Sequence, residues 1–282
     1  MGSLSQSVRL FSPSKLNLFF RVLRKREDGY HEIASLFQTI DLGDAVHVAL
    51  SERDRFTCSD ESLATTSNLV IKARELFRSK TGIRQFYNVH LTKCVPMQAG
   101  LGGGSGNAAS ALWAFNQLAG HPATINELIK WSSELGSDVP FFFSNGTAFC
   151  RGRGEILENV EPLQETSLWI AKPKEGLSTK LVYENYQEQD SSSLDPHDAL
   201  QTFLKGTPCY FNDLERSAFQ LLPSLSDMKK RLLDLGFTTV VMTGSGTAFF
   251  CLGEMRSPSL ENSEFFKVNF IRRQEGNWYE CN

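Results

Sequence analysis

The sequence predicts a fold that contains both α-helices and β-strands. Runs rich in branched and aromatic residues dominate the first third, apolar residues at helical spacing follow a glycine-rich segment in the centre, and helices and strands mix in the last third. With 282 residues, of which 41% are hydrophobic and 22% charged, the chain is long enough for two domains or one large one and can bury a core.

Composition and charge exclude several classes of protein. Lys and Arg total 29 against 32 Asp and Glu, a formal net charge of −3, which argues against a general nucleic-acid binder. The chain has no run of about 18 apolar residues that could span a membrane, and its N-terminal stretch lacks the apolar core of a secretion signal. We therefore expect a cytoplasmic protein that acts on a small molecule, with no nucleic-acid, membrane or obligate protein partner.

The cysteines and histidines show no metal-binding pattern. None of the six cysteines belongs to a C-x-x-C pair, no Cys/His set has zinc spacing, and the five histidines form no H-E-x-x-H motif. Reduced thiols in a cytosolic protein fit this pattern best. The sequence therefore predicts no dedicated metal ligands.

The first third of the chain is predicted to be β-structure. Residues 8–11 and 16–23 are apolar-rich runs on either side of a short Ser-Pro-Ser break. Residues 32–40 form a further run, and the turn-like residues 41–44 lead from it into residues 45–50. This pattern predicts a hairpin.

Helix signals follow in the centre. Asn68 can cap a helix that carries an apolar stripe, and residues 86–94 have the composition of a strand. Behind the central glycines, residues 107–119 carry apolar side chains at helical spacing. Thr124 and Glu127 have the spacing of a capping box, which predicts another helix directly after it.

Helices and strands mix in the last third, and a domain boundary is expected near residues 150–165. A polar stretch with three consecutive serines, residues 184–197, is typical of a surface loop. The remaining predicted elements are strands at 168–172, 237–242, 247–252 and 268–272, and helices near 213–222, 224–235 and 259–266.

The central glycine segment has the composition of a phosphate-binding loop. Five of the seven residues from 100 to 106 are glycine, and a helix follows at once, so unpaired N–H groups and the positive end of a helix dipole would face an anion. The alternative is a flexible or tight entry into the helix. A Walker A loop is excluded because the chain has no Gly-Lys dipeptide, whereas Gly104-x-Gly106-x-x-Ala109 matches the dinucleotide pattern and keeps an NAD site open.

Two charged residues stand in apolar surroundings. Lys15 lies among strand residues, where it either faces solvent at a strand end or needs a partner for its charge. Asp138 precedes Val139-Pro140 and is either a helix N-cap or a fixed proton acceptor. A lysine beside it would keep its carboxylate ionised.

Two turn-like segments also admit a structural and a functional interpretation. Tyr30 and His31 open a predicted strand and could stack on and hydrogen-bond a planar base, or they could be packed side chains. Gly244, Ser245 and Gly246 could form a simple hairpin turn or present N–H groups to a second phosphate.

Taken in order, these segments resemble the GHMP kinase superfamily. The glycine loop marks the superfamily as a whole, whereas the Ser-Pro-Ser-Lys-Leu-Asn and Asp-Gly-Tyr-His segments point to one kinase within it. The matching segments extend over most of the chain. They are residues 12–18, 29–31, 36–38, 96–109, 135–140 and 243–246.

The resemblance implies an α+β fold with two domains. Residues 1–160 would form the ATP-binding N-terminal domain, which is like domain 2 of ribosomal protein S5. Residues 161–282 would form a ferredoxin-like C-terminal domain that binds the substrate. The nucleotide is expected between the two domains, a common place for a ligand site.

The resemblance also assigns roles to single residues. Asp138 matches the catalytic base of the family, and Lys15 matches its partner. The residues that match substrate-binding positions are Asn17, near the reacting end of the substrate, and Tyr30, His31 and Tyr183, around its cytosine. The residues that match the ATP loop are Pro96, Met97, Gln98, Ala99, Gly100, Leu101, Gly102, Gly103, Gly104, Ser105 and Gly106.

The implied activity is an ATP-dependent phosphorylation in isoprenoid biosynthesis. The acceptor would be the 2-hydroxyl, a tertiary alcohol, of a methylerythritol derivative that carries a cytidine diphosphate group. ATP would be the co-substrate with Mg²⁺, and Ser105 could touch the metal. A homoserine- or mevalonate-type kinase, an NAD-dependent oxidoreductase and a non-catalytic ligand sensor remain as alternatives.

One departure from the family pattern lies at the start of the loop. Many members have Gly-Gly where this chain has Gln98-Ala99, so we expect altered nucleotide contacts rather than loss of binding. The stretch before Lys15 is short for a plastid transit peptide, which favours a bacterial over a plant enzyme.

Overall fold

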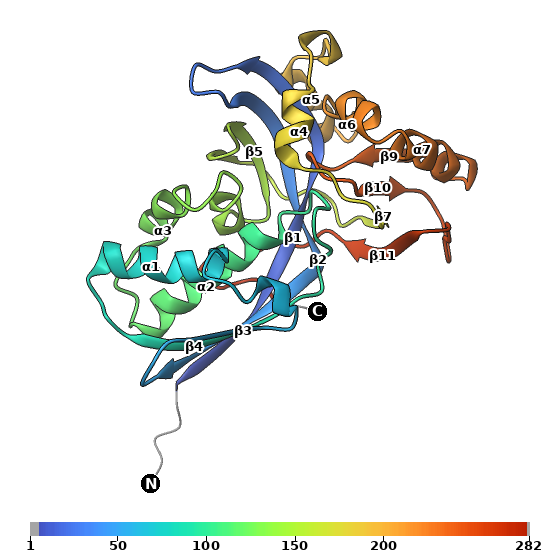
Figure 1. The fold of residues 1–282 in the computed structure, drawn as a ribbon. Coiled ribbons are helices and arrows are strands. Elements are labelled where there is room, and N and C mark those ends of the chain that lie inside the picture. The colour runs from blue at the N-terminus through green and yellow to red at the C-terminus, as the bar shows by residue number, and fades with distance from the viewer. Residues whose placement is uncertain (1–5, 281–282) are drawn as a thin grey trace.

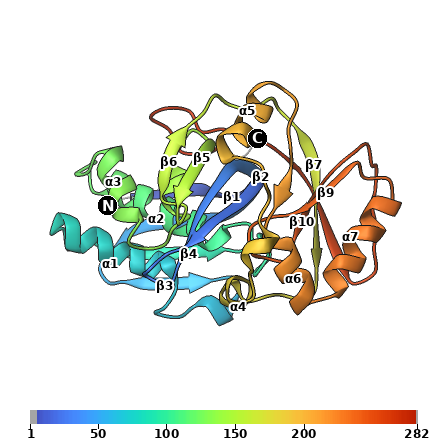
Figure 2. The same ribbon diagram turned by 90° about the horizontal axis from the view of Figure 1, so that it is seen from above.

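The structure, a computed structural model, describes residues 6–280 and contains two β-sheets with helices packed around them (Figures 1 and 2). This arrangement confirms the predicted α+β class. The first five residues of the N-terminal stretch and Cys281 lie outside the described part. No helix within residues 6–280 is long and apolar enough to cross a membrane.

The first sheet is built on two long antiparallel strands, β1 (Ser7–Lys25) and β2 (His31–Ser51). In Figure 1 they run side by side from the lower helical half of the molecule to its top. The other strands are β3 (Arg55–Cys58), β4 (Phe86–Thr92), β5 (Thr147–Gly152), β6 (Ile156–Asn159) and β8 (Phe211–Asn212). The sheet has the order β3-β4-β2-β1-β8, while β5 pairs with β2 and carries β6.

The strands β1 and β2 are each continuous, so the predicted strand break and the predicted hairpin are both wrong. Residues 41–44 form no hairpin turn, because β2 continues along β1 beyond them. The extra residues form an irregularity in which Pro13 pairs with Gly43 while the next residue, Ser14, pairs with Ile40. The partner strand satisfies the backbone groups on both sides of this bulge, and tertiary pairing thus overrides the local turn signal.

Three helices cover the first sheet: α1 (Leu69–Thr81), α2 (Gly103–Leu118) and α3 (Ile125–Ser132). At the start of α1, Asn68 Oδ1 accepts a hydrogen bond from the Val70 N–H over 3.0 Å, as predicted. Thr124 and Glu127 form the predicted capping box of α3. Helix α2 begins at Gly103 rather than at residue 107, so part of the glycine loop is helical.

The second sheet is antiparallel and contains β7 (Ser167–Pro173), β9 (Thr239–Met242), β10 (Phe249–Leu252) and β11 (Ser263–Asn269). Its order is β11-β7-β10-β9. The helices of this half are α4 (Thr179–Glu184), α5 (Pro196–Leu204), α6 (Glu215–Leu221) and α7 (Ser224–Asp234). In both views α7 lies at the outer right of the molecule, and in Figure 1 α6 lies above β9. Three single turns are 3₁₀-helical: η1 (Glu61–Leu63), η2 (Pro140–Phe143) and η3 (Glu188–Asp190).

The helix predicted at residues 259–266 is wrong, because β11 occupies Ser263–Asn269, and the strand predicted at 268–272 begins earlier than expected and ends at Asn269. Phe265 and Phe266 pack into different hydrophobic clusters, as neighbouring strand residues on opposite faces must. Two adjacent phenylalanines imitate a helical apolar stripe in sequence, but here they fill both sides of a sheet edge.

The end of the chain returns to the first sheet. Arg273 is buried and donates hydrogen bonds to the carbonyl oxygens of Phe143, over 2.8 Å, and Ser144, over 3.0 Å. The Trp278 indole N–H donates to the Phe11 carbonyl oxygen over 2.9 Å, and its ring lies 5.1 Å from that of Trp113. These contacts fasten the C-terminal segment to the end of η2, to β1 and to α2.

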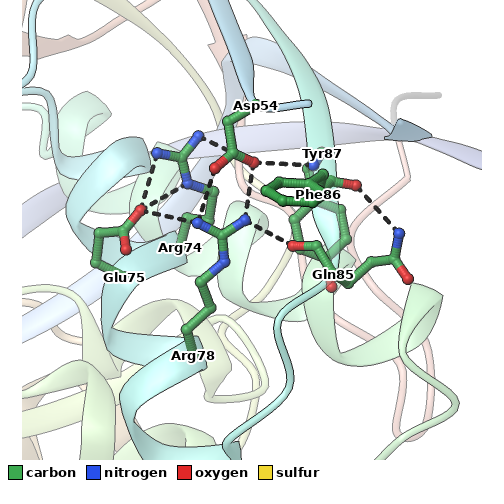
Figure 3. A network of polar contacts seen from close by, with 7 residues as sticks. All are labelled: Asp54, Arg74, Glu75, Arg78, Gln85, Phe86 and Tyr87. Atoms are coloured by element: carbon green, nitrogen blue, oxygen red, sulfur yellow. Dashed lines mark hydrogen bonds and ion pairs between the residues drawn. The ribbon is translucent and has the colours of Figure 1, made fainter. Parts of the chain in front are cut away.

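A network of polar contacts ties α1 to the edge of the first sheet (Figure 3). Asp54 accepts two hydrogen bonds of 2.8 Å from the Arg78 guanidinium and a third, over 3.1 Å, from the Tyr87 N–H. Arg78 also donates to the Gln85 carbonyl oxygen over 2.6 Å. The hydrogen bonds from Arg78 hold the pKa of Asp54 below its usual value although burial opposes this.

Candidate active site

Lys15 lies on β1 with its ammonium group buried and paired. Its Nζ is 3.3 Å from Asp138 Oδ2, donates a 2.7 Å hydrogen bond to Asn17 Oδ1 and lies 4.7 Å from the centre of the Phe37 ring. The whole residue is only 3% exposed. The solvent-facing alternative for Lys15 is therefore wrong, and the paired one is correct.

Asp138 lies immediately before η2, and its side chain does not cap that turn. The N-cap position belongs to Val139, and η2 has no side-chain cap. Instead the carboxylate faces Lys15 and is 31% exposed. Among the described residues Lys15 is its only polar side-chain partner. The two charges that stand far apart in the sequence thus meet, as predicted, and the carboxylate keeps free lone pairs toward solvent.

Asn17 is fully buried beside this pair, and its amide is engaged by protein groups. Its Oδ1 accepts from Lys15, its Nδ2 donates to Ser35 Oγ over 2.9 Å, and its backbone N–H donates to Thr243 Oγ1 over 3.0 Å. Asn17 therefore orients the ammonium group of Lys15. Its expected contact with a substrate stays a prediction.

The predicted ATP loop lines a cavity of about 490 Å³. Gly102 adopts a left-handed conformation, with φ 66°, as the N-cap of α2. By helix geometry the next three N–H groups, those of Gly103, Gly104 and Ser105, have no partner within the helix. The start of α2 therefore offers backbone donors and a positive dipole end to an anion in this cavity.

Some glycines of the loop are needed for close packing rather than for donors. A Cβ on Gly106 would lie 2.4 Å from the Pro13 carbonyl oxygen, and the Gly106 N–H already donates to Gly102 O. Gly104 and Gly106 lie inside α2 and not in a turn between a strand and a helix. The dinucleotide pattern therefore lacks the structural context that an NAD site requires.

The base of the loop is held by a residue that the sequence analysis took for part of a turn. Asp44 is buried and accepts hydrogen bonds from the backbone N–H groups of Cys94, over 2.6 Å, and Val95, over 2.8 Å. It also accepts from the Asn107 amide over 2.8 Å and forms an ion pair with Lys93. A glycine before an aspartate was the only signal, and it is common to turns.

A second cavity, of about 760 Å³, shares Gly100 and Gly102 with the first and contains the Lys15–Asp138 pair. The three predicted aromatic residues meet in it. The rings of His31 and Tyr183 stack with their centres 5.1 Å apart, and Tyr30 is 57% exposed at the rim. Burial, with a smaller contribution from Lys25, lowers the pKa of His31, and burial raises the pKa of Tyr183.

The second glycine turn joins β9 to β10 as a hairpin, as predicted, and packs on the ATP loop. A Cβ on Gly246 would lie 2.0 Å from the backbone nitrogen of Gly100, so only glycine allows this approach. Gly244 and Ser245 line the larger cavity, and a Cβ on Gly244 would lie 3.5 Å from Lys15 Nζ. The turn thus borders the ion pair, while its binding of a phosphate stays a prediction.

Comparison with known proteins decides the family. The sequence matches the family model of the GHMP kinases N terminal domain over residues 68–146. A 4-diphosphocytidyl-2-C-methyl-D-erythritol kinase of Protochlamydia amoebophila is 51% identical over 97% of this chain and 93% of its own length. The chain belongs to the family of 4-diphosphocytidyl-2-C-methyl-D-erythritol kinases. It is a kinase with an alcohol as phosphoryl acceptor, as the resemblance predicted.

Further relatives and solved structures agree with this family. The chloroplastic enzyme of Arabidopsis thaliana is 41% identical over 97% of this chain and 76% of its own length. A crystal structure of 4-(cytidine 5'-diphospho)-2C-methyl-D-erythritol kinase superposes with a TM-score of 0.79 at 30% identity, covering 94% of this chain and 99% of that one. Homoserine kinase from Cytophaga hutchinsonii, at 19% identity and a TM-score of 0.71 over 97% of this chain and 98% of its own, shares the fold alone.

The larger cavity of this kinase holds basic residues that the sequence analysis missed. Lys25, Arg153 and Lys180 all line it. The Arg153 guanidinium lies 5.1 Å from the centre of the Tyr30 ring. Each residue comes from a different segment, and none carries a recognisable motif, so only the folded chain shows that these charges meet.

A further missed residue supports the second glycine turn of this kinase. Asn212, on β8, donates from its amide to the carbonyl oxygens of Met242, over 2.7 Å, and Gly244, over 2.8 Å. It is buried and reaches across from the first sheet. The predicted helix near residues 213–222 included its neighbourhood but gave no reason to single it out.

Proposed function

We propose that this chain transfers the γ-phosphoryl group of ATP to the 2-hydroxyl of 4-diphosphocytidyl-2-C-methyl-D-erythritol, giving the 2-phosphate and ADP. The observation that carries the proposal is the position of the Lys15–Asp138 pair where the two cavities share Gly100 and Gly102. A phosphate on one side and an alcohol on the other would meet at this pair. Phosphoryl transfer asks the protein mainly for such positioning and for charge stabilisation.

Asp138 is the proton acceptor of the proposed reaction. Its carboxylate faces the cavity with lone pairs that no described side chain other than Lys15 engages, so a substrate hydroxyl can donate to it. The buried ammonium of Lys15 favours the charged carboxylate and can also stabilise charge on the transferred group. An aspartate is a weak base for an alcohol, so the proton moves late and positioning contributes more than basicity.

The start of α2 is the proposed phosphate site, and the residues around it suit Mg²⁺ bound with the nucleotide. Mg²⁺ is usually held by substrate phosphates, water and one or two carboxylates rather than by a protein cage. Within residues 6–280 no group of three potential ligands forms such a cage, whereas Ser105 and Asp138 offer oxygen atoms at the two cavities. The ion would neutralise charge on the phosphates.

The larger cavity has the chemistry expected for a cytidine diphosphate group. Tyr30, His31 and Tyr183 provide aromatic faces and polar edges for the cytosine. Lys25 and Arg153 line the same cavity and provide positive charge for the diphosphate, together with Lys180. A homoserine or mevalonate substrate would leave these aromatic and basic groups without partners.

A coupled assay of ADP release with a panel of alcohols tests the proposal. We expect turnover with 4-diphosphocytidyl-2-C-methyl-D-erythritol and none above background with homoserine or mevalonate. Preferred turnover of either of the other alcohols would contradict the proposed substrate. Tyr186→Phe serves as a control variant in this assay, because Tyr186 lies 5.8 Å from the His31 ring but does not line the cavity. We expect it to keep the preference for the cytidine substrate over homoserine and mevalonate.

Two observations support a bacterial cytoplasm as the cellular setting. A bacterial relative is 51% identical, against 41% for the chloroplastic relative of Arabidopsis thaliana, which supports a bacterial enzyme. The five described cysteines are free thiols, which suits a reducing cytoplasm.

A further inference from the structure

Gln98, in the ATP loop, has an unusual backbone conformation. Its φ is 53°, in the left-handed region that disfavours a residue with a Cβ. Only His121 and Asn262 share this feature among the other non-glycine residues of the described chain. A glycine would fit the turn at Gln98 with less strain, so backbone contacts of the loop must hold this conformation, while the side chain itself is exposed.

The contacts of Gln98 cross from the ATP loop to the second sheet. Its carbonyl oxygen accepts a hydrogen bond from the Thr247 N–H over 3.2 Å. Its side-chain amide lies against Gly176, since a Cβ on that glycine would come within 1.9 Å of Gln98 Oε1 and 2.9 Å of Cδ. A side chain at position 176 would therefore displace the Gln98 amide from its present position.

The segment that contains Gly176 is tied down by further hydrogen bonds. Thr247 Oγ1 and Lys172 Nζ both donate to the Glu175 carbonyl oxygen, over 2.8 and 2.9 Å. Ser245 Oγ donates to Thr179 Oγ1 over 2.9 Å. Thr179 is the first residue of α4, and α4 carries Tyr183 into the substrate cavity. A chain of contacts thus leads from the ATP loop to the proposed base site.

We propose that Gln98 is a positioning residue that couples the two sites, so that ATP and the cytidine substrate strengthen each other's binding. This inference rests on the proposed function. Gln98 lines the nucleotide cavity, and α4 lines the substrate cavity. A nucleotide that fixes the loop also fixes the amide against Gly176, and the substrate then meets an α4 that is already in place. Coupling of this kind acts equally in both directions.

Calorimetric titration of cytidine diphosphate, with and without a non-hydrolysable ATP analogue and Mg²⁺, measures the coupling. We expect the analogue to lower the Kd of cytidine diphosphate at least about 5-fold in the unmodified protein. Gln98→Ala keeps a Cβ but removes the amide, and we expect it to bring the ratio of the two Kd values close to one. A ratio that stays at its unmodified value in this variant would overturn the proposal.

A second pair of variants tests the same contact from the other side. The backbone of Gly176 lies outside the left-handed region, and the three atoms nearest to a Cβ there all belong to the Gln98 side chain, so Gly176→Ala displaces that side chain. We expect this variant to lower the ratio and to be less stable, and we expect Gln98→Gly in the same chain to restore stability but not the ratio. A restored ratio in the double variant would overturn the coupling role of the amide.

His121→Gly is the control for the Gln98→Gly change of the double variant. It likewise replaces a left-handed residue, with φ 61°, by glycine, on the loop after α2, and we expect it to keep the unmodified ratio. A lowered ratio in this control would assign the coupling to backbone strain in general and overturn the proposal. Failure of cytidine diphosphate to bind at all would contradict the proposed function itself, whereas binding with a ratio of one in the unmodified protein would contradict only the inference.

Discussion

Two lysine–aspartate pairs lie on either side of the start of α2, and their surroundings differ. In the pair that faces the substrate cavity, Lys15 is buried and the Asp138 side chain is 31% exposed. In the pair at the nucleotide cavity the exposures are reversed, with the Asp44 side chain fully buried and that of Lys93 at 13%. The more exposed member of each pair is the one that can meet a ligand.

The hydrogen bonds of the two carboxylates explain what each can do. Asp44 is saturated, because backbone N–H groups, an amide and an ammonium group all donate to it. Asp138 has one ionic partner and open lone pairs. A buried carboxylate whose acceptor positions are all hydrogen-bonded fixes a loop. A carboxylate with free acceptor positions beside a fixed cation can accept a proton. The same two residue types therefore build a structural and a reactive site.

The largest expected effect comes from Asp138→Asn. This variant keeps the shape and removes the negative charge, so we expect kcat to fall by about 10²–10⁴-fold. The ATP loop does not depend on Asp138, and the affinity for ATP should stay nearly unchanged. Steady-state assays of kcat, with calorimetric titration of ATP, measure both quantities. Unchanged turnover would remove Asp138 from the mechanism.

The same substitution at the other pair should act on stability. Asp44→Asn leaves the ammonium of Lys93 without its counter-ion, and breaking such a pair costs about 3–5 kcal/mol of unfolding free energy. Because Asp44 holds the base of the ATP loop, we also expect a higher KM for ATP. Urea unfolding of both variants provides the comparison. A loss of stability in Asp138→Asn as large as in Asp44→Asn would erase the distinction between the two pairs.

How far sequence reasoning reaches depends on whether a feature is local. The glycine segment at residues 100–106 and the helix behind it could be predicted because glycines before a helix are a backbone device within one segment, while the binding of phosphate there stays a prediction. The meeting of Lys15 with Asp138 was expected from the family resemblance, since no spacing rule joins two such distant residues. Asp44 was taken for a turn residue, because its partners come from residues 93–95, which follow β4, and from α2.

Prediction from the sequence reaches the same limit at the larger cavity. Tyr30 and His31 stand in a motif, but Arg153 and Lys180 reach the cavity from segments without one. The wrong hairpin at residues 32–50 and the wrong helix at residues 259–266 have a related cause. Strand pairing along β1 overrode a local turn signal, and strand pairing on β7 overrode an apparent helical stripe. A local sequence pattern does not show which distant strands will pair with each other.

Tyr30→Ala tests the larger cavity, which contains the Lys15–Asp138 pair. There side chains rather than backbone groups would hold the ligand. Stacking of a base on an aromatic ring contributes about 1–3 kcal/mol, so we expect KM for the cytidine substrate to rise about 5- to 100-fold while KM for ATP changes little. Phe86→Ala, at another exposed ring far from the cavity, is the control. An equal rise of both KM values would contradict the stacking role.

The smallest expected effect is on the pH dependence of substrate binding. Burial and the nearby Lys25 lower the pKa of His31, so its imidazole stays neutral below the pH near 6.5 at which an exposed histidine titrates. We expect KM for the cytidine substrate to be constant from pH 8 to about pH 6.5 and to rise a few-fold only below that, when the protonated imidazole loses the acceptor nitrogen that a cytosine amino group would use. The unfolded chain takes up this proton first, so stability should also fall as the pH drops through this range. His31→Gln should make KM independent of pH here, and a variant that keeps the acid rise would assign it to another group.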